Sequence, residues 1–393
     1  MRSRLAESNL DLALLIGFIL IASLDSVFKY TGGSGLAAYA IGGSVLLFVY
    51  FRKAFPVLVE RTPLAASALI AGMILVGLIA ATFYLYHLAN SGLIGPGSDG
   101  DDALIIGATE LLNGRYPFYP PTYLGNPIAP MPGAILYALP FVALGIYPLQ
   151  NMFWLVAFFG IVGFWTGSFR GALFLAIPIL LVSPTIFQNL AAGSDHITNS
   201  VLVLLFTLLI IRAVKKNDAK LWEWLIPAIL LGIGLSTRTN FAFVMPLLVV
   251  WIAKVKGVRR SLTISAVVAT AFLIVTLPFY LYDPPGFTPL YVQSGKMQQF
   301  NDILPQAGLI LGICSLLLST ILAFRASWEK TGTFFQSLAW VQLFILLFTS
   351  TLYILWVAHF NLYFGHIGYG LFVMFFGVFA QWARLAPTRS GMD

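Results

Sequence analysis

The stretch from residue 64 to residue 88, LAASALIAGMILVGLIAATFYLYHL, decides the fold of this chain. It contains no Asp, Glu, Lys or Arg, and it exceeds the roughly 20 apolar residues that a helix needs to cross a bilayer. The whole chain is 59% hydrophobic and only 9% charged, whereas soluble chains are about half apolar and about a quarter charged. The sequence therefore predicts an all-α, polytopic membrane protein.

Similar apolar runs recur along the chain, and we expect about 12 membrane-spanning helices from their lengths. The predicted spans are 9–30, 34–51, 64–88, 133–149, 152–169, 197–213, 222–237, 241–254, 261–281, 306–324, 334–354 and 364–382. The first run follows a basic start but lacks a convincing small-residue cleavage site, so we predict a retained helix and not a cleaved signal peptide.

Loops rich in Lys and Arg stay in the cytoplasm in most membrane proteins, and they set the predicted topology. With the basic N-terminus (Arg2, Arg4) in the cytoplasm, the basic loops alternate correctly with the spans and place residues 89–132 outside. One apolar stretch between these residues and the next basic loop must then fail to cross. We predict a re-entrant segment at 171–190, because Pro184 interrupts its helix.

Composition excludes several classes of function. The single cysteine, Cys314, excludes an internal disulfide framework and a cysteine metal cluster. The net charge of +7 comes from basic residues scattered among short loops, so we expect no nucleic-acid partner. No Gly-rich phosphate loop appears, which argues against a nucleotide-sugar donor.

The predicted outer loop begins with an unusual gathering of acids. Residues 95–119, GPGSDGDDALIIGATELLNGRYPFY, hold four of the 15 carboxylates of the chain. From Asp101 to Gly114 the apolar residues recur on one helical face, so we predict a short amphipathic helix lying in the membrane interface. Gly114 is a natural C-terminal stop. A stiff segment rich in aromatic residues and proline follows it.

The aspartates of this helix start have two readings. Asp99 and Asp102 could each cap the helix N-terminus. Three aspartates within four residues exceed what one cap requires, however, and a carboxylate at the membrane surface can act as a general base. Asp99 and Asp101 could also hold a divalent cation through oxygens, but the spacing is weakly specific and we expect no metal or other cofactor.

At this point the sequence resembles a family. The stretch DDALIIGATELLNGRYPFY (101–119) resembles the first external loop of the GT-C glycosyltransferases, which are integral membrane enzymes. The stretches LLVSPTIFQNLAAGSDHITNS (180–200) and GIGLSTRTNFAFVMPLLVV (232–250) are similar to the polyprenyl-phosphate-mannose-dependent branch of that family. The resemblance covers roughly residues 64–260. It divides the chain into two additional helices (1–62), a catalytic core (63–260) and C-terminal helices (261–393).

The resemblance implies a membrane enzyme that takes one sugar from a polyprenyl-phosphate donor on the outer face of the inner or plasma membrane. It implies that an acidic residue of the first external loop deprotonates the acceptor hydroxyl. The matching residue is Asp101 or Asp102, and we favour Asp101. The acceptor is a glycan, a lipid or a protein. The turn GSDH (193–196) and Arg238, where a Lys is common, depart from the pattern of that branch.

The leaving phosphate needs a cation, and Arg is suited to bind it. Arg238 ends a predicted span on the outer side, where it binds phosphate or snorkels to the headgroups. Lys296, Arg115 and His196 are second choices. Asp195 and His196 sit at the start of the 197–213 span, and Asp195 acts there either as a helix cap or, with His196, as a substrate contact. The predicted substrate-binding set is Arg238, Asp195, His196, Asp99, Tyr119 and Lys296.

Other classes remain open on the sequence alone. A transporter or flippase of a lipid-linked sugar would carry ionisable residues near the membrane midplane, whereas the acids of this chain collect at one predicted surface. A membrane O-acyltransferase would need a buried His. A purely structural subunit is the remaining alternative.

Overall fold

The computed structural model describes residues 9–93, 97–326, 330–362 and 368–385. Arg2 and Arg4, on which the predicted orientation partly rests, lie outside these ranges. The described residues form helices joined by turns and loops, without a β-strand, and their β structure is limited to an isolated bridge between Pro121 and Pro127. The all-α fold class is therefore confirmed for the described part of the chain.

The chain forms two compact units, and each is assembled from separate segments. Unit 1 comprises Met1–Phe83, Met152–Gln188 and Ala326–Asp393, and unit 2 comprises Tyr84–Asn151 and Asn189–Arg325. The division at residues 62 and 260 that the resemblance implies is of a different kind and stays a prediction. Each unit is described by itself below.

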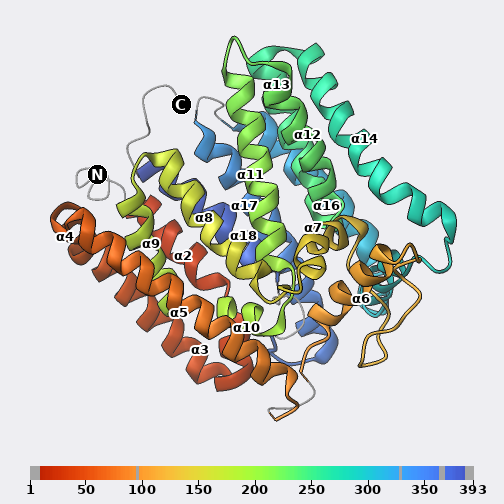
Figure 1. Ribbon diagram of the computed structural model, residues 1–393, viewed down its shortest axis with the longest axis horizontal. Helices are drawn as coiled ribbons and strands as arrows, with labels where there is room; N and C mark the ends of the chain where they lie inside the picture. Colours follow the sequence, from red (N-terminus) through yellow and green to blue (C-terminus); the bar gives the residue numbers. More distant parts are fainter. Residues whose placement is uncertain (1–8, 94–96, 327–329, 363–367, 386–393) are drawn as a thin grey trace. The chain divides into compact units, whose positions relative to one another are not determined.

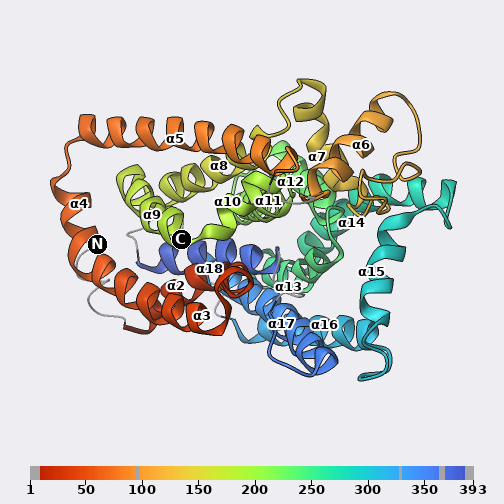
Figure 2. The ribbon, with the colours of Figure 1, turned by 90° about the horizontal axis from the view of Figure 1, so that it is seen from below.

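Unit 1 holds the N-terminal and C-terminal helices. In this unit α18 lies beside α2 and packs along α17 (Figure 2). Gly377 of α18 permits the close approach, because a Cβ there would lie 2.3 Å from the Phe18 ring of α2. The helices are α2 (Asn9–Ile21), α3 (Leu24–Val49), η1 (Tyr50–Ala54), α4 (Phe55–Arg61), α9 (Phe169–Val182), α17 (Thr331–Val357) and α18 (Tyr369–Leu385), with most of α5 (Leu64–Asn90), α8 (Leu149–Thr166) and α10 (Pro184–Ala192).

Unit 2 surrounds α11, whose side chains are almost all buried. Helix α12 packs between α11 and α14, and α13 packs against α14 and α16 (Figure 1). The helices of this unit are α6 (Gly100–Leu112), α7 (Pro132–Ala143), α11 (His196–Lys215), α12 (Leu221–Leu235), η2 (Thr239–Phe243), α13 (Val244–Lys256), α14 (Val258–Tyr282), α15 (Thr288–Gln298) and α16 (Ala307–Arg325).

Eight described helices are long and apolar enough to cross a membrane. They are Leu24–Arg61, Leu64–Asn90, Leu149–Thr166, His196–Lys215, Thr239–Lys256, Val258–Tyr282, Ala307–Arg325 and Thr331–Val357. Four shorter apolar helices, α2, α7, α12 and α18, coincide with the remaining predicted spans. Membrane-spanning character is thus supported, while the full predicted count stays a prediction.

Two predicted interruptions are present in the backbone. Helices α9 and α10 meet at an angle of 81° around Ser183, so the predicted break at Pro184 is confirmed. Pro184 has no N–H to continue the hydrogen-bond ladder of α9. Near the break, the Tyr39 hydroxyl donates to the carbonyl of Val182, the last residue of α9, at 2.7 Å. Between the predicted spans 9–30 and 34–51, the chain leaves helical geometry at Gly32 (φ 67°, ψ −165°).

Candidate functional site

The predicted helix of the acidic loop is present as α6, and it ends where expected. Asn113 follows its last residue, and Gly114 adopts φ +67°, a left-handed conformation that glycine reaches without strain. The Arg115 N–H closes the last turn on the Glu110 carbonyl at 2.9 Å. The start and the end of the predicted helix are therefore both confirmed.

The apolar face of α6 packs against protein. Leu104 and Ala108 are fully buried. A Cβ on Gly107 would lie 2.9 Å from the Ile135 side chain of α7, so glycine brings the two helices into close contact. Leu112, which the periodicity also assigns to this face, is 51% exposed. The packing against α7 fixes the direction in which the helix start, with its aspartates, points.

Asp101 is the most buried of these aspartates, with 4% of its surface exposed. Its Oδ2 accepts hydrogen bonds from the Tyr86 hydroxyl at 2.6 Å and from Asn90 Nδ2 at 3.2 Å. Its Oδ1 is buried and has no hydrogen-bond partner among the described residues. Burial raises the pKa of Asp101, and the hydrogen bond from Tyr86 opposes that rise. One carboxylate oxygen therefore accepts two side-chain hydrogen bonds, while the other is buried without one.

Asp99 makes no side-chain capping hydrogen bond, so that part of the capping reading is wrong, although Asp102 lies in the first turn as predicted. Although Asp99 occupies the N-cap position, its Oδ2 accepts from Thr122 Oγ1 and from Asn126 Nδ2, both at 2.8 Å. The Oδ2 of Asp102 accepts from the Tyr123 N–H at 2.6 Å. Both carboxylates therefore fasten the loop that follows α6 onto the start of that helix.

A glycine turn lies directly against the start of α6. Gly193 has φ +60°, and a Cβ there would lie 2.5 Å from the Cβ of Asp101. A Cβ on Gly100 would likewise lie 2.4 Å from Ser194 Oγ. At Gly193 only glycine allows so close an approach, because the nearest atom is a Cβ and the φ angle is positive. The turn at 193–195 and the helix start consequently form one site.

Polar side chains just before α8 and in its first turn hold this turn. The Tyr147 hydroxyl donates to the Gly193 carbonyl at 2.6 Å, and Asn151 Nδ2 donates to the Ser194 carbonyl at 2.5 Å. Thr198 fixes the Asn151 amide by donating to its Oδ1 at 2.9 Å. Burial, followed by the charges of Asp195 and Asp101, raises the pKa of Tyr147 well above its usual value. Tyr147 therefore stays protonated and keeps its role as a donor.

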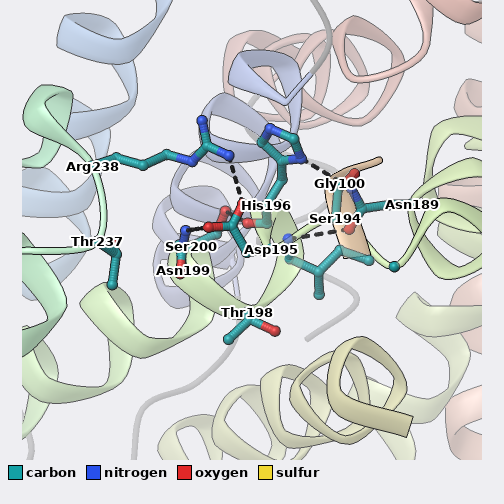
Figure 3. A network of polar contacts seen from close by, with 12 residues as sticks. Gly100, Asn189, Ser194, Asp195, His196, Thr198, Asn199, Ser200, Thr237 and Arg238 are labelled. Atoms are coloured by element: carbon teal, nitrogen blue, oxygen red, sulfur yellow. Dashed lines mark hydrogen bonds and ion pairs between the residues drawn. The ribbon is translucent and has the colours of Figure 1, made fainter. Parts of the chain in front are cut away.

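The turn ends in a buried ion pair (Figure 3). Asp195 is 3% exposed, and its Oδ1 lies 2.5 Å from Arg238 Nη2. Its Oδ2 accepts from Asn199 Nδ2 at 2.7 Å. Burial acts to raise the pKa of Asp195, but the Arg238 charge and these hydrogen bonds outweigh it and hold the pKa below its usual range. The Asp195 side chain orients Arg238 and makes no side-chain capping bond.

The end of α12 brings Arg238 to this pair. The Thr237 hydroxyl bonds the Gly234 carbonyl at 2.7 Å, and Arg238 then continues in an extended conformation (φ −155°, ψ 142°). Gly133 of α7 donates its N–H to the Ser236 carbonyl at 3.1 Å. A Cβ on Gly133 would lie 2.2 Å from the Ile233 carbonyl oxygen, so glycine is required there too.

His196 and Lys296 complete the charged surroundings. His196 is 9% exposed, and its Nδ1 lies 3.1 Å from Asn189 Nδ2. Asn189 Oδ1 accepts from the Ile197 N–H at 3.4 Å, so the Asn189 amide links His196 to the first turn of α11. Lys296 lies on α15 and reaches the surface. Desolvation by the surrounding protein lowers its pKa most, the charge of Arg238 lowers it further, and the charge of Asp99 raises it. Lys296 thus belongs to the same electrostatic environment as Arg238.

The structure brings most of the predicted site residues together. They are Asp99, Asp101, Asp102, Asp195, His196, Arg238 and Lys296, and all belong to unit 2. Tyr119 instead contacts Tyr116 and Asp283. Arg115, just after α6, pairs with Glu110 of that helix at 2.5 Å, and its side chain is 59% exposed.

Sequence reasoning missed the partners of these residues. Tyr86 and Asn90 are spaced i, i+4 at the end of the 64–88 run, which places them on one helical face and could have been noticed. Gly193, Tyr147 and Asn151 gave no such signal, because their importance depends on contacts that join distant segments. Within the described residues, no three His, Cys, Asp or Glu side chains converge as a metal site would require.

Comparisons of the chain with known protein families, with curated proteins and with solved structures find no match. The residues and the geometry of this site are therefore the basis for the function proposed below.

Proposed function

We propose that this protein is a GT-C-type glycosyltransferase that transfers one sugar from a polyprenyl-phosphate donor to an acceptor hydroxyl at the outer face of the inner or plasma membrane. The observation that carries the proposal is the state of Asp101. It is a buried carboxylate with one oxygen fixed by Tyr86 and Asn90 and the other unpaired. Such asymmetry suits a general base, whose free oxygen must receive a proton.

In the proposed reaction, Asp101 Oδ1 accepts the proton of the acceptor hydroxyl. The hydroxyl oxygen then attacks the anomeric carbon of the donor, and the bond from that carbon to the phosphate oxygen breaks. The departing polyprenyl phosphate carries negative charge, which Arg238 and Lys296 stabilise. Asp195 holds Arg238 by one of its nitrogens, and the other N–H groups of the guanidinium suit phosphate oxygens. Because Oδ1 is buried here, the acceptor must displace a neighbouring group to reach it.

The proposed membrane arrangement follows the predicted topology. The four shorter apolar helices join the eight long ones as spans, the N-terminus is cytoplasmic, and the bent pair α9–α10 is re-entrant. Helix α6 then lies at the outer interface, where the phosphate of a lipid-linked donor must be. Transport or flipping of a lipid-linked sugar is the second candidate, and the bent pair favours it, since broken helices line transport paths.

The test replaces Asp101 with Asn and measures single-turnover transfer from a synthetic short-chain polyprenyl-phospho-sugar. Transfer should fall by about 10²- to 10⁴-fold, the usual contribution of a general base. Asp102 fastens the loop, so Asp102→Asn should reduce transfer much less than Asp101→Asn. Normal transfer by the Asp101 variant would move the role to Asp102 or exclude this mechanism, and translocation without transfer by the parent protein would support the second candidate.

Thermal unfolding of the same variant separates loss of chemistry from loss of fold. Because the folded-state pKa of Asp101 lies above its unfolded value, the ionised carboxylate destabilises the fold as pH rises through that range. A neutral Asn should therefore keep or raise the Tm at pH 7. A marked fall in Tm would show that Asp101 has a structural role instead.

A further inference from the structure

The stiff segment after α6 carries tyrosines whose rings are exposed. Tyr119 is 59% exposed, and Tyr282, at the end of α14, is 72% exposed. Tyr116 lies between them, with ring centroids 4.6 Å from Tyr119 and 5.2 Å from Tyr282. We call Tyr116, Tyr119, Tyr282 and the adjacent Asp283 the tyrosine platform. All four residues belong to unit 2.

Buried aromatic rings hold the platform rigid from below. Phe118 and Phe287 are each 2% exposed, and their ring centroids lie 5.1 Å apart in an edge-to-face arrangement. The Thr288 hydroxyl donates to the Ile128 carbonyl at 2.5 Å, which ties the start of α15 to the segment that follows α6. A surface that is fixed before binding loses little conformational entropy when a ligand arrives.

The hydroxyl group of Tyr116 is turned towards protein, since it donates to the Phe279 carbonyl at 2.9 Å. Tyr119 lies beside Asp283, and desolvation first and then this carboxylate raise the pKa of Tyr119. Asp283 is fixed in turn by the Gly286 N–H, which donates to its Oδ1 at 3.1 Å. Tyrosines of a membrane-interface belt present their polar ends to the headgroups. Tyr119 instead lies beside a carboxylate of the protein itself.

Exposed aromatic rings beside a carboxylate match the chemistry of a sugar. A pyranose presents C–H groups on one face, which pack on the electron-rich face of an aromatic ring. Hydroxyl groups at its edge donate hydrogen bonds to a carboxylate. Apolar lipid chains have no hydrogen-bond donor for Asp283, and its negative charge would repel a phosphate.

The platform is also close to the candidate site. The Tyr123 N–H bonds Asp102, and Tyr123 interacts electrostatically with Asp101 and Asp99. Tyr119 and Tyr123 are four positions apart in the chain, so their Cα atoms are at most about 14 Å apart. A ligand whose reacting hydroxyl lies at Asp101 would reach the platform if it were a short chain of sugars.

We propose that the tyrosine platform binds a sugar unit of a carbohydrate acceptor, with Tyr119 and Tyr282 stacking on its ring and Asp283 accepting hydrogen bonds from its hydroxyls. This inference rests on the proposed function for the statement that the ligand is the acceptor. Among glycan, lipid and protein acceptors, it selects a glycan, and one of at least two sugar units.

Binding can be measured without donor or turnover. The Asp101→Asn protein, reconstituted in lipid nanodiscs, is titrated with mannose and glucose oligosaccharides of one to five units, and the dissociation constant is followed by saturation-transfer NMR. Affinity in at least one series should rise with length and then level off. Tyr119→Leu and Tyr282→Leu should each weaken binding of the longer chains about tenfold and abolish the dependence on length, while leaving monosaccharide binding unchanged.

Tyr291→Leu is the matched control, because Tyr291 is 74% exposed on α15 but lies outside the platform. Equal effects of Tyr119→Leu and Tyr291→Leu, or binding of no oligosaccharide in either series, would overturn the platform. Reduced incorporation of Tyr119→Leu and Tyr282→Leu into nanodiscs with unchanged sugar binding would identify a membrane anchor instead. Oligosaccharide binding at the platform without sugar transfer by the parent protein would reject the proposed function and leave the platform intact.

Discussion

The two carboxylate oxygens of Asp101 lie in different environments. Tyr86 and Asn90 stabilise the negative charge on Oδ2, whereas Oδ1 is buried without a partner. An unpaired buried acceptor costs about 1–3 kcal/mol, and such costs persist mainly where function requires them. If Asp101 is the base, the hydrogen bond from Tyr86 sets the balance between proton affinity and ionisation.

Tyr86→Phe tests that balance. Removing the hydroxyl removes a hydrogen bond that stabilises the ionised form, so the pKa of Asp101, already raised by burial, should rise further. A base works only when it is deprotonated, and activity should therefore be lost at a higher pH than in the parent protein. The measurement is kcat/KM across pH 5 to 9. A uniform loss at every pH, with the acid limb in place, would make Tyr86 a packing residue only.

Arg238 cannot be tested by simple truncation. Arg238→Ala leaves Asp195 buried without its cation, which should cost about 3–5 kcal/mol of folding stability. The double variant Asp195→Asn/Arg238→Gln removes both charges together, so it should recover most of that stability while transfer stays low. Chemical unfolding and single-turnover transfer measure the two effects. Normal donor affinity in the double variant would confine Arg238 to a structural role beside Asp195.

At the scale of elements, α6 acts as a fastening point for the segment that follows it. Asp99 holds Thr122 and Asn126, and Asp102 holds Tyr123. Since the same helix start carries Asp101, the position of the loop and the position of the proposed base are linked through one rigid element.

Asp99→Ala should therefore loosen the loop while leaving α6 folded. The backbone amides of residues 121–126 should exchange with deuterium at least several-fold faster, because two hydrogen bonds that restrain local opening are lost. Hydrogen exchange followed by mass spectrometry measures this. Glu110→Ala, which breaks only the pair with Arg115 at the other end of the helix, is the control, and equal acceleration in both variants would contradict the fastening role.

Much at this scale could be predicted from sequence. Length and hydropathy located the long helices, periodicity located α6, and Pro184 and Gly114 marked a break and an end, because each signal is local. The roles of Asp99, Asp102 and Asp195 could not be predicted. Capping needs only neighbours along the helix. Apart from Asn199, which bonds Asp195 from four residues away, their partners lie 21 to 43 residues away.

For the whole molecule, the decisive question is which parts of unit 2 lie on each side of the membrane. The proposed arrangement places Ser91, after α5, outside and Lys216, after α11, inside. In a Cys314→Ser background, a cysteine at Ser91 should react with an impermeant maleimide added to intact cells, and a cysteine at Lys216 should react only after lysis. Labelling of both from the same side would remove the basis for an outer-face site.

The assembly of the site across segments was beyond local sequence reasoning. Asp101, Gly193 and Arg238 belong to three separate stretches, and the contacts that unite them are the close approach at Gly193 and the ion pair with Asp195. A hydropathy pattern specifies that a segment is buried, but not which other segment it meets.

The glycine at position 193 has a consequence for heredity. Every amino acid that a single-nucleotide change of a glycine codon can encode carries a β-carbon, and any β-carbon at this position would collide with Asp101. No missense change at this codon is therefore conservative. A geneticist who ranked positions by the damage of missense alleles would place residue 193 beside the aspartate itself, although glycine contributes no side chain to the chemistry.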